Sequence, residues 1–449
     1  MNSPDIAINN ATIINEGSCK TGSVLIKNGR IYDILFDPKD FIYGTIHTID
    51  ASGKFLIPGV IDDQVHFRDP GLTFKGSIYS ESAAAVAGGI TSFMDMPNTV
   101  PQTLSIDLVK EKLHIASMNS VANYSFYLGA SMDNISEIAS ADPQLICGVK
   151  VFMGSSTGNM LVNDPKTLEQ IFKLSPLIIA THCEDDTIIN RNLNAAKLKY
   201  GDNIPFEIHP VIRSEEACYA SSSLAVELAS KYDVRLHLLH LSTAKELKLL
   251  SAKTGNDDKK ITAEVCVHHL WFSDEDYNRL GARIKWNPAV KSAKDREALL
   301  DAVNNGLIDI IATDHAPHTL EEKSKSYFHC PSGGPLVQHS LVAMMELYLD
   351  HKISLTTIVD KMCHSPARIF NIRDRGFIRI NYMADLVLID PSSPWTVESD
   401  NILYHCGWSP FEGTQFHSQV THTFVNGQLV YNNGVVDRSI RGQQITFNR

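Results

Sequence analysis

Eight apolar runs of strand length, separated by segments with helical character, constrain the fold of this chain more than any other feature. The runs lie at 59–67, 91–96, 124–130, 148–153, 177–183, 235–241, 261–270 and 308–316. The segments typical of helices include 79–89, 214–232, 243–253 and 292–306, the last of which ends on Gly306 as a helix stop. Near-continuous apolar strands alternating with helices predict a parallel sheet covered on both faces, and eight of them predict closure into a (β/α)8 barrel.

An open doubly wound sheet is the alternative arrangement for the same strands. No GxGxxG sequence follows the first run, and no GxxxxGK[ST] sequence occurs in the chain. Since those glycine patterns cradle phosphates in nucleotide-binding folds, nothing favours a nucleotide-binding version of the open sheet.

Both ends of the chain carry a second pattern, in which short apolar stretches are broken by Gly and Asn. It covers residues 4–55, and it returns at 384–391 and 421–434 with Asn-Gly pairs at 426–427 and 433–434. Asn-Gly tolerates the positive φ angles of tight hairpin turns. We therefore expect a small β-sandwich formed by both termini, so that the expected domains are 1–55 and 369–449 for the sandwich and 56–368 for the barrel.

Composition excludes several classes of function. A length of 449 residues suits one barrel with an accessory module, and the formal net charge of −11 argues against nucleic acid as a partner. No apolar run is long enough to span a membrane, and no basic segment followed by an apolar one indicates export. The eight cysteines include no CxxC pair, which indicates reduced thiols, so we expect a cytoplasmic protein.

Polar residues that can bind a metal lie at or just past the ends of five of the apolar runs. They are His66, Lys150, His182, His240 and Asp314. A single histidine in such a place is more often structural, but the C-terminal ends of all strands in a parallel barrel converge on one face. Imidazole and carboxylate are the ligands of hydrolytic zinc sites, so their coincidence predicts a metal centre there.

Lys150 is unusual in this set because its run, GVKVFM, is apolar on both sides. The structural alternative is a lysine whose stem is buried while its ammonium group reaches solvent. Burial beside a cation instead favours the neutral amine, which reacts with carbon dioxide. The resulting carbamate offers two oxygens that can bridge two metal ions.

Several motifs together resemble the dihydroorotase branch of the amidohydrolase superfamily over nearly the whole chain. They are IPGVIDDQVHFRDPG, MPNT, GVKVF, THCED, LLHLS, KWNPAVK, ATDHAPHT, ADLVLID and SPFEGTQF. The resemblance implies a TIM barrel with a terminal β-sandwich and one or two Zn2+ ions per chain, bridged by carboxylated Lys150. It implies His66, Lys150, His182, His240 and Asp314 as the metal ligands, with Asp314 also the catalytic acid and base.

The activity implied is the reversible, zinc-dependent hydrolysis of (S)-dihydroorotate to N-carbamoyl-L-aspartate in de novo pyrimidine biosynthesis. Arg68 lies two residues after His66 on the same face of an extended segment, and its planar fork matches the substrate carboxylate. Resemblance adds Asn98 and His318 as carboxylate partners and Asn287 as a ring contact. Each has a structural alternative: Arg68 as a salt-bridge residue at the barrel rim, and the other three as turn, loop or surface residues.

One position departs from the family pattern. The first strand of the family usually reads D-x-H-x-H, whereas this chain has Asp62-Asp63-Gln64-Val65-His66, so that Gln64 replaces the first histidine. An amide oxygen is a weaker zinc ligand than an imidazole nitrogen, and we expect the metal position beside Gln64 and His66 to be weakened.

Alternatives remain open. Allantoinase and dihydropyrimidinase share the barrel and the metal centre, and a non-catalytic partner of aspartate transcarbamoylase is the alternative that Gln64 supports. We also expect a homo-oligomer, with a dimer as the simplest form. The polar loop at 319–335 is either a lid over the substrate or a passive connection, and none of His268, His269 and His315 is assigned as a ligand.

Overall fold

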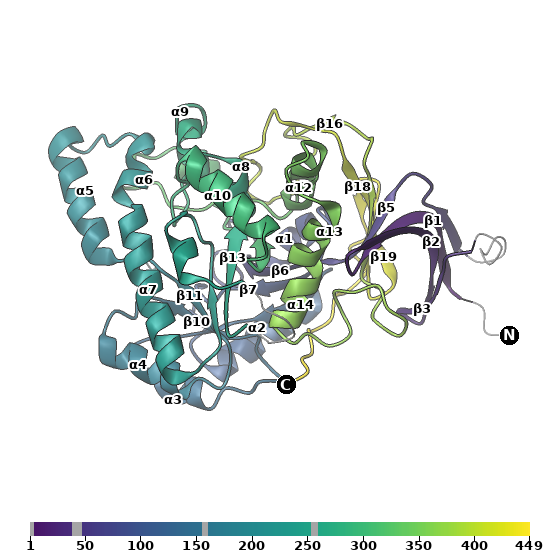
Figure 1. Cartoon of the computed structure of the whole chain (residues 1–449), viewed down its shortest axis with the longest axis horizontal. Helices are drawn as coiled ribbons and strands as arrows, with labels where there is room; N and C mark the ends of the chain where they lie inside the picture. The colour runs from purple at the N-terminus through teal and green to yellow at the C-terminus, as the bar shows by residue number, and fades with distance from the viewer. Residues whose placement is uncertain (1–3, 38–46, 155–159, 253–258) are drawn as a thin grey trace.

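The computed structural model describes residues 4–37, 47–154, 160–252 and 259–449 of the chain. A barrel surrounded by helices forms the larger part, and a twisted sheet stands at its side (Figure 1). The purple strands of the N-terminus and the yellow strands of the C-terminus meet in that sheet.

The barrel is formed by the strands that the eight apolar runs predict, all of which pair in parallel. They are β6 (Val60–Val65), β7 (Ile90–Asp95), β8 (Asn123–Phe126) continued by β9 (Leu128–Gly129), β10 (Val149–Phe152), β11 (Ile179–His182), β12 (Leu236–Leu238), β13 (Ile261–Cys266) and β14 (Ile310–Ala312). The ring closes between β14 and β6, where the backbone N–H of His66 donates to the carbonyl of His315 over 2.7 Å. The predicted (β/α)8 barrel is confirmed.

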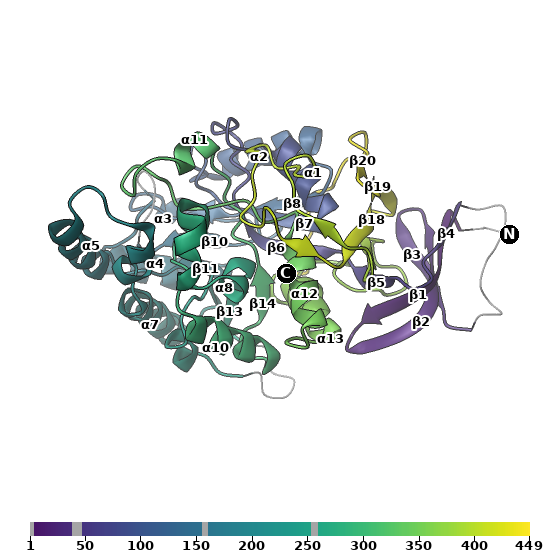
Figure 2. The same cartoon turned by 90° about the horizontal axis from the view of Figure 1, so that it is seen from above.

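Helices cover the outside of the barrel, as Figures 1 and 2 show. They are α1 (Ile78–Ala87), α2 (Ile106–Asn119), α3 (Ile135–Ala139), α4 (Pro165–Leu174), α5 (Asp186–Tyr200), α6 (His209–Ile212), α7 (Glu215–Tyr232), α9 (Tyr277–Leu280), α10 (Ala293–Asn304), α11 (Leu320–Lys323), α12 (Ser340–Leu349), α13 (Leu355–Val359) and α14 (Ser365–Ile369). The start of α10 is fixed by a capping box between Ser292 and Asp295, and Gly306 follows its end at φ 72°. Among the described residues, no helix combines the length and the apolar character needed to cross a membrane.

Two expected elements differ in the structure. The helix expected at 243–253 is only a 3-10 turn at Glu246–Leu249, because the buried Glu246 carboxylate accepts hydrogen bonds from Ser222 and Thr243 and holds the chain in place. Lys253, the end of that expectation, lies outside the described residues. The run 261–270 is a strand only to Cys266, after which α8 (Val267–Trp271) begins.

The second sheet has nine strands and draws on both ends of the chain. They are β1 (Ile6–Asn15), β2 (Ser18–Lys27), β3 (Arg30–Leu35), β4 (His47–Asp50), β5 (Phe55–Pro58), β15 (Leu386–Asp390), β18 (Gln419–Val425), β19 (Gln428–Asn432) and β20 (Val435–Val436). Strand β5 lies between β1 and β15, which joins the two termini in one sheet. The hairpin turn at Asn426 and Gly427 has φ angles of 52° and 74°, as the Asn-Gly pair predicts.

The sheet and the barrel pack on one another through alternate side chains of the same strand. Leu386 and Leu388 of β15 belong to the apolar core of the sheet, whereas Val387 and Ile389 belong to the core shared with the barrel. The chain passes from sheet to barrel at Gly59, between β5 and β6. A Cβ atom there would lie 2.0 Å from Oγ1 of Thr91, so the crossing requires glycine.

The C-terminal segment also packs against the barrel near both of its ends. The short strands β16 (Trp395–Thr396) and β17 (Gln415–Phe416) flank a stretch in which Trp408 donates from Nε1 to the carbonyl of His318 over 2.7 Å. At the opposite end, Ile445 and Phe447 pack with Phe370 in the apolar interior of the barrel. The barrel therefore opens to solvent mainly at the C-terminal ends of its strands.

Candidate active site

One cavity of about 670 Å³ collects every residue that the sequence places in the site. Its lining includes His66, Arg68, Asn98, Lys150, His182, His240, Asn287, Asp314 and His318, and also Gln64. These residues come from the ends of β6, β7, β10, β11, β12 and β14 and from the loops that follow. Convergence of the strand ends has brought side chains together across some 250 residues of sequence, as the barrel geometry predicts.

His66 is oriented by Asn98. Nδ1 of the imidazole lies 2.7 Å from Oδ1 of Asn98, so Nδ1 carries the proton and donates to the amide oxygen. In a neutral ring this leaves the lone pair on Nε2, which lies 3.1 Å from Oδ1 of Asp314. A lone pair and a carboxylate oxygen that face each other create a place for a cation.

His182 is oriented in the same way by a buried carboxylate. Its Nε2 donates to Oε2 of Glu184 over 3.0 Å, and its Nδ1 lies 3.0 Å from Nε2 of His240. Burial raises the pKa of Glu184, but Arg213 and His182 outweigh it and lower that pKa to about 2. Burial lowers the pKa values of His182 and His240, which keeps both rings neutral as metal coordination requires.

Lys150 is 1% exposed and lies on β10, with its Nζ 4.5 Å from the centre of the Phe152 ring. Burial lowers the pKa of Lys150 to about 8, although the negative charges of Asp314 and Glu264 act to raise it. A substantial fraction of this lysine is therefore a neutral amine near physiological pH, which is the form that reacts with carbon dioxide.

Three residues of the cavity lining hold a left-handed backbone. The φ angles are 68° at Arg68, 39° at His240 and 48° at Asp314. This conformation is costly for side chains other than glycine, and such residues gather at functional sites where the surroundings enforce them. Here it turns each side chain into the cavity at the point where its strand ends.

Two cationic side chains, Arg68 and Lys75, also line the cavity. Nη2 of Arg68 lies 3.0 Å from Nε2 of His318, and Nζ of Lys75 lies 3.1 Å from Nδ1 of the same ring. Lys75 also pairs with Glu322 at 2.8 Å. Burial lowers the pKa of Arg68 to about 10, which leaves it charged at neutral pH. The local field therefore favours an anion, in spite of the negative charge of the whole chain.

The segment 319–335 forms one wall of the cavity. It begins with α11, and the buried Lys323 donates from Nζ to the carbonyls of Pro331 and Gly333. Pro331, Ser332, Gly333 and Asn287 all line the cavity. The side-chain oxygen of Asn287 is buried and has no hydrogen-bond partner among the described residues, so it is available to a ligand.

Gln64 does not stand in for an imidazole. Its Nε2 donates to Oδ1 of Asp314 over 3.3 Å, and its Oε1 accepts from the thiol of Cys266 over 3.7 Å. An amide nitrogen has no lone pair for a metal, so in this orientation Gln64 offers no ligand atom toward Asp314.

Comparison with known proteins decides the family. A profile described as the Amidohydrolase family matches residues 55–430, which covers the barrel and, in the terminal sheet, β5, β15, β18 and part of β19. The chain belongs to the amidohydrolase family. Among curated relatives, a dihydroorotase of Methanosarcina acetivorans is 33% identical over 423 residues, covering 91% of this amidohydrolase and 88% of the relative. A dihydroorotase of Clostridioides difficile is 32% identical over 446 residues, covering 95% and 100%.

Solved structures give the same fold. An L-hydantoinase (dihydropyrimidinase) from Arthrobacter aurescens has a TM-score of 0.92 and 27% identity, with 99% of this amidohydrolase and 100% of that chain covered. A dihydropyrimidinase from Brevibacillus agri has a TM-score of 0.87 at 23% identity, covering 99% of each chain, and supports the fold alone. The resemblance drawn from the sequence motifs is confirmed.

The cavity residues of this amidohydrolase fit a zinc centre. His66 and His182 each donate one ring N–H to a side-chain oxygen and direct the other nitrogen inward, which is how neighbouring groups orient metal-binding histidines. Nδ1 of His240 is buried without a hydrogen-bond partner in the described part of the chain. Lys150 and Asp314 complete a set of nitrogen and oxygen donors of the kind that Zn2+ prefers.

Sequence reasoning missed three groups in this amidohydrolase. The first is Glu184, two residues after His182, whose carboxylate orients the His182 ring. The glutamate of the THCED motif was the sequence feature that could have indicated this role. Lys75 lines the cavity, and only its pairing with His318 reveals it. The third group, Asp63, His237 and Glu264, lies inside the barrel. Polar residues within otherwise apolar strand runs were its signal.

Proposed function

We propose that this amidohydrolase is a zinc-dependent dihydroorotase, which opens the ring amide of (S)-dihydroorotate to N-carbamoyl-L-aspartate and also catalyses ring closure. The observation that carries the proposal is that Arg68 and His318 line the same cavity as the donor set of Lys150, His182 and His240. A substrate with an anionic group on a cyclic amide is complementary to this combination.

Arg68 binds the exocyclic carboxylate. Its Nε donates to the carbonyl of Pro317 over 3.1 Å and its Nη2 contacts His318, which fix the plane of the guanidinium. Nη1 makes no hydrogen bond within the described residues and is available to a carboxylate oxygen. Asn98 adds its amide N–H2, since its oxygen accepts from His66. Asn287 accepts a ring N–H with its buried side-chain oxygen.

Asp314 is the group that moves the proton. Its Oδ1 accepts a hydrogen bond from Nε2 of Gln64 over 3.3 Å and lies 3.1 Å from Nε2 of His66. In the hydrolytic direction its carboxylate takes a proton from the attacking water and returns it to the departing ring nitrogen. In the direction of ring closure the same oxygen accepts a proton from the attacking nitrogen.

The ligands proposed for zinc are His66, Lys150, His182, His240 and Asp314, with Lys150 as the carbamate that joins two positions. When bound, zinc supplies Lewis acidity, which polarises the amide carbonyl and makes water more acidic. Since Gln64 turns its amide N–H2 toward Asp314 and its oxygen accepts from Cys266, we propose that the position of Lys150, His182 and His240 fills first.

Other cyclic amidases are the nearest alternatives, because the solved relatives include hydantoinases. Substrates such as dihydrouracil lack the carboxylate that Arg68 would bind, and allantoin presents a different ring. A non-catalytic partner of aspartate transcarbamoylase is disfavoured, because only Gln64 departs from the expected donor set in the cavity. We also propose that the protein acts on a small-molecule substrate, and that it forms a homo-oligomer in the cytoplasm.

The test compares turnover of dihydroorotate, dihydrouracil, hydantoin and allantoin by the full chain, with and without added Zn2+. We expect dihydroorotate to be preferred by orders of magnitude in kcat/KM and turnover to depend on zinc. Equal or better turnover of a substrate without a carboxylate would overturn the assignment, and no turnover of any of them would support the non-catalytic alternative.

A further inference from the structure

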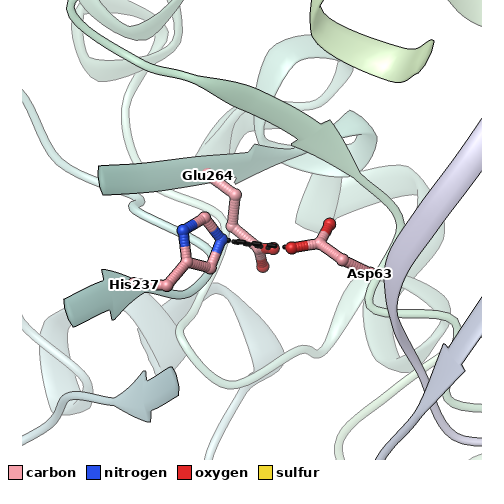
Figure 3. Close-up of side chains that lie close together, drawn as sticks. All are labelled: Asp63, His237 and Glu264. Atoms are coloured by element: carbon pink, nitrogen blue, oxygen red, sulfur yellow. Dashed lines mark hydrogen bonds and ion pairs between the residues drawn. The ribbon is translucent and has the colours of Figure 1, made fainter. Parts of the chain in front are cut away.

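A second group of metal-binding side chains lies inside the barrel, outside the lining of the cavity. Asp63 of β6, His237 of β12 and Glu264 of β13 point toward one another across the interior (Figure 3). All three are fully buried at 0% exposure. In the sequence, Asp63 lies three residues before His66, and His237 lies three residues before His240. The cluster is therefore one layer deeper in the barrel than the cavity.

The distances within the cluster fit a metal ion. Nε2 of His237 lies 3.2 Å from Oδ2 of Asp63 and 3.3 Å from Oε2 of Glu264, and the possible ligand atoms of the group lie within 4.8 Å of one another. Ligands at about 2.0 Å from a tetrahedral zinc ion are about 3.3 Å apart. A hydrogen bond between imidazolium and carboxylate is shorter, at about 2.7–2.9 Å.

The protonation of His237 leaves a place for a cation. The hydroxyl of Thr262 donates to the carbonyl of Leu236 over 3.2 Å, so its oxygen accepts from Nδ1 of His237 over 2.8 Å. In a neutral ring the lone pair is then on Nε2, directed at two carboxylates. Neither oxygen of Asp63 has a hydrogen-bond partner among the described residues. Three electron-rich groups that face one another without a cation are unfavourable in a dry interior.

Charge balance favours a divalent ion over a proton. With an imidazolium, the two carboxylates leave the cluster with a net charge of −1, whereas a divalent ion and neutral His237 balance their charge. Burial lowers the pKa of His237, but Asp63 and Glu264 outweigh it and raise that pKa to about 9. The shift of His237 expresses the demand of the two carboxylates for added positive charge.

We propose that Asp63, His237 and Glu264 hold a buried divalent metal ion of the Zn2+ class, separate from the metal centre of the cavity. Asp63 supplies both oxygens, and Nε2 of His237 and Oε2 of Glu264 complete four ligands. The ion joins three strands of the barrel from inside. The other carboxylate oxygen of Glu264 accepts from the backbone N–H of His240 over 3.0 Å, so the ion also supports the chain where it turns His240 into the cavity.

The proposal does not rest on the activity, and its test measures zinc directly. Crystals of the full chain, purified without chelators and equilibrated with Zn2+, are measured on both sides of the zinc absorption edge. We expect an anomalous peak between Asp63, His237 and Glu264, resolved from any peak beside Lys150. No peak inside the barrel, whether or not the cavity is occupied, would overturn the proposal and identify His237 as an imidazolium.

Two variants test it in solution by metal analysis after dialysis. Asp63→Asn should lose one zinc equivalent per chain, while Lys150→Met should lose zinc from the cavity and keep the buried ion. Glu246→Gln is the matched control, because Glu246 is another buried carboxyl group whose partners are hydroxyl groups of Ser222 and Thr243. Its zinc content should equal that of the wild type. Unchanged zinc content in Asp63→Asn would contradict the proposal, and the crystal measurement stands if that variant fails to fold.

Discussion

Gln64 donates a hydrogen bond from Nε2 to Oδ1 of Asp314, 3.3 Å away, at the position where relatives of this fold class are expected to carry a histidine. The amide thus directs toward Asp314 its nitrogen, which has no lone pair to offer a metal. Asp314 keeps His66 as its other neighbour at 3.1 Å. From this geometry we expect a metal position beside β6 to be weaker than the one at Lys150, His182 and His240, which leads to the first prediction.

Gln64→His should add one zinc ion in the cavity. An imidazole in place of the amide supplies a second nitrogen ligand beside His66, which Zn2+ prefers to an amide. The measurement is metal content after dialysis, together with anomalous density that locates each ion. Gln64→Met, which has similar length and no ligand for zinc, should leave the content unchanged. Two fully occupied zinc positions in the wild-type cavity would contradict the prediction.

Arg68→Met should raise KM for dihydroorotate by about 10- to 100-fold with a smaller change in kcat, since a charged hydrogen bond to the carboxylate contributes about 1.5–3 kcal/mol. Steady-state kinetics provide the measurement. Arg283→Met is the control, because Arg283 pairs with Glu412 and does not line the cavity. Kinetics of Arg68→Met equal to those of the control would remove Arg68 from the site.

Lys150 should carry a carbamate. The pKa of Lys150 is lowered to about 8, so the neutral amine increases as the pH rises from 6 to 9, and uptake of carbon dioxide should increase with it. The measurement is a carbamate resonance in protein equilibrated with carbon-13 bicarbonate. Lys150→Met should remove the signal.

The control for that experiment is Lys285→Met. Burial also lowers the pKa of Lys285 to about 8, but its Nζ donates to the carbonyls of Tyr327 and Cys330 outside the proposed metal centre. The carbamate signal should survive in this variant. A signal that is lost with Lys285 and kept without Lys150 would refute the assignment.

Glu184→Gln should weaken zinc binding by about 10- to 100-fold, because the carboxylate orients His182. It should also change acid stability. The pKa of Glu184 is lowered from 4.5 to about 2 in the folded chain, so its contribution to the free energy of unfolding is complete above pH 4.5 and is lost as the pH falls toward 2. That contribution is about 3 kcal/mol at most.

Denaturant unfolding of metal-free protein between pH 2 and 7 measures this effect. The free energy of unfolding of the wild type should fall more steeply between pH 4.5 and 2 than that of Glu184→Gln. Parallel curves for the two proteins would show that the carboxylate contributes nothing to acid stability.

The barrel and the cavity residues could be predicted from sequence because their pattern follows from topology alone. His182 and His240 end apolar runs, and parallel strands bring such ends together whatever their exact register. Glu184 and Lys75 were missed because their roles depend on partners, His182 and His318, that only three-dimensional packing supplies.

The interior cluster was missed for a different reason. Strand β6 has irregular pairing with β7 between Asp62 and Val65, so simple alternation does not tell which of its side chains faces the interior. The prediction of a helix at 243–253 was wrong because Glu246 makes a buried hydrogen bond with Ser222, which lies 24 residues away in the sequence. Local patterns contain no information about such distant partners.

The position of β5 between β1 and β15 has a consequence for folding of the chain during its synthesis. Residues 55–58 pair with 386–389, so one edge of β5 has no permanent neighbour until more than three hundred further residues have left the ribosome. A strand edge exposed for that long is a ready partner for other chains. During synthesis, the N-terminal strands are therefore the part of this molecule that most needs protection by a chaperone.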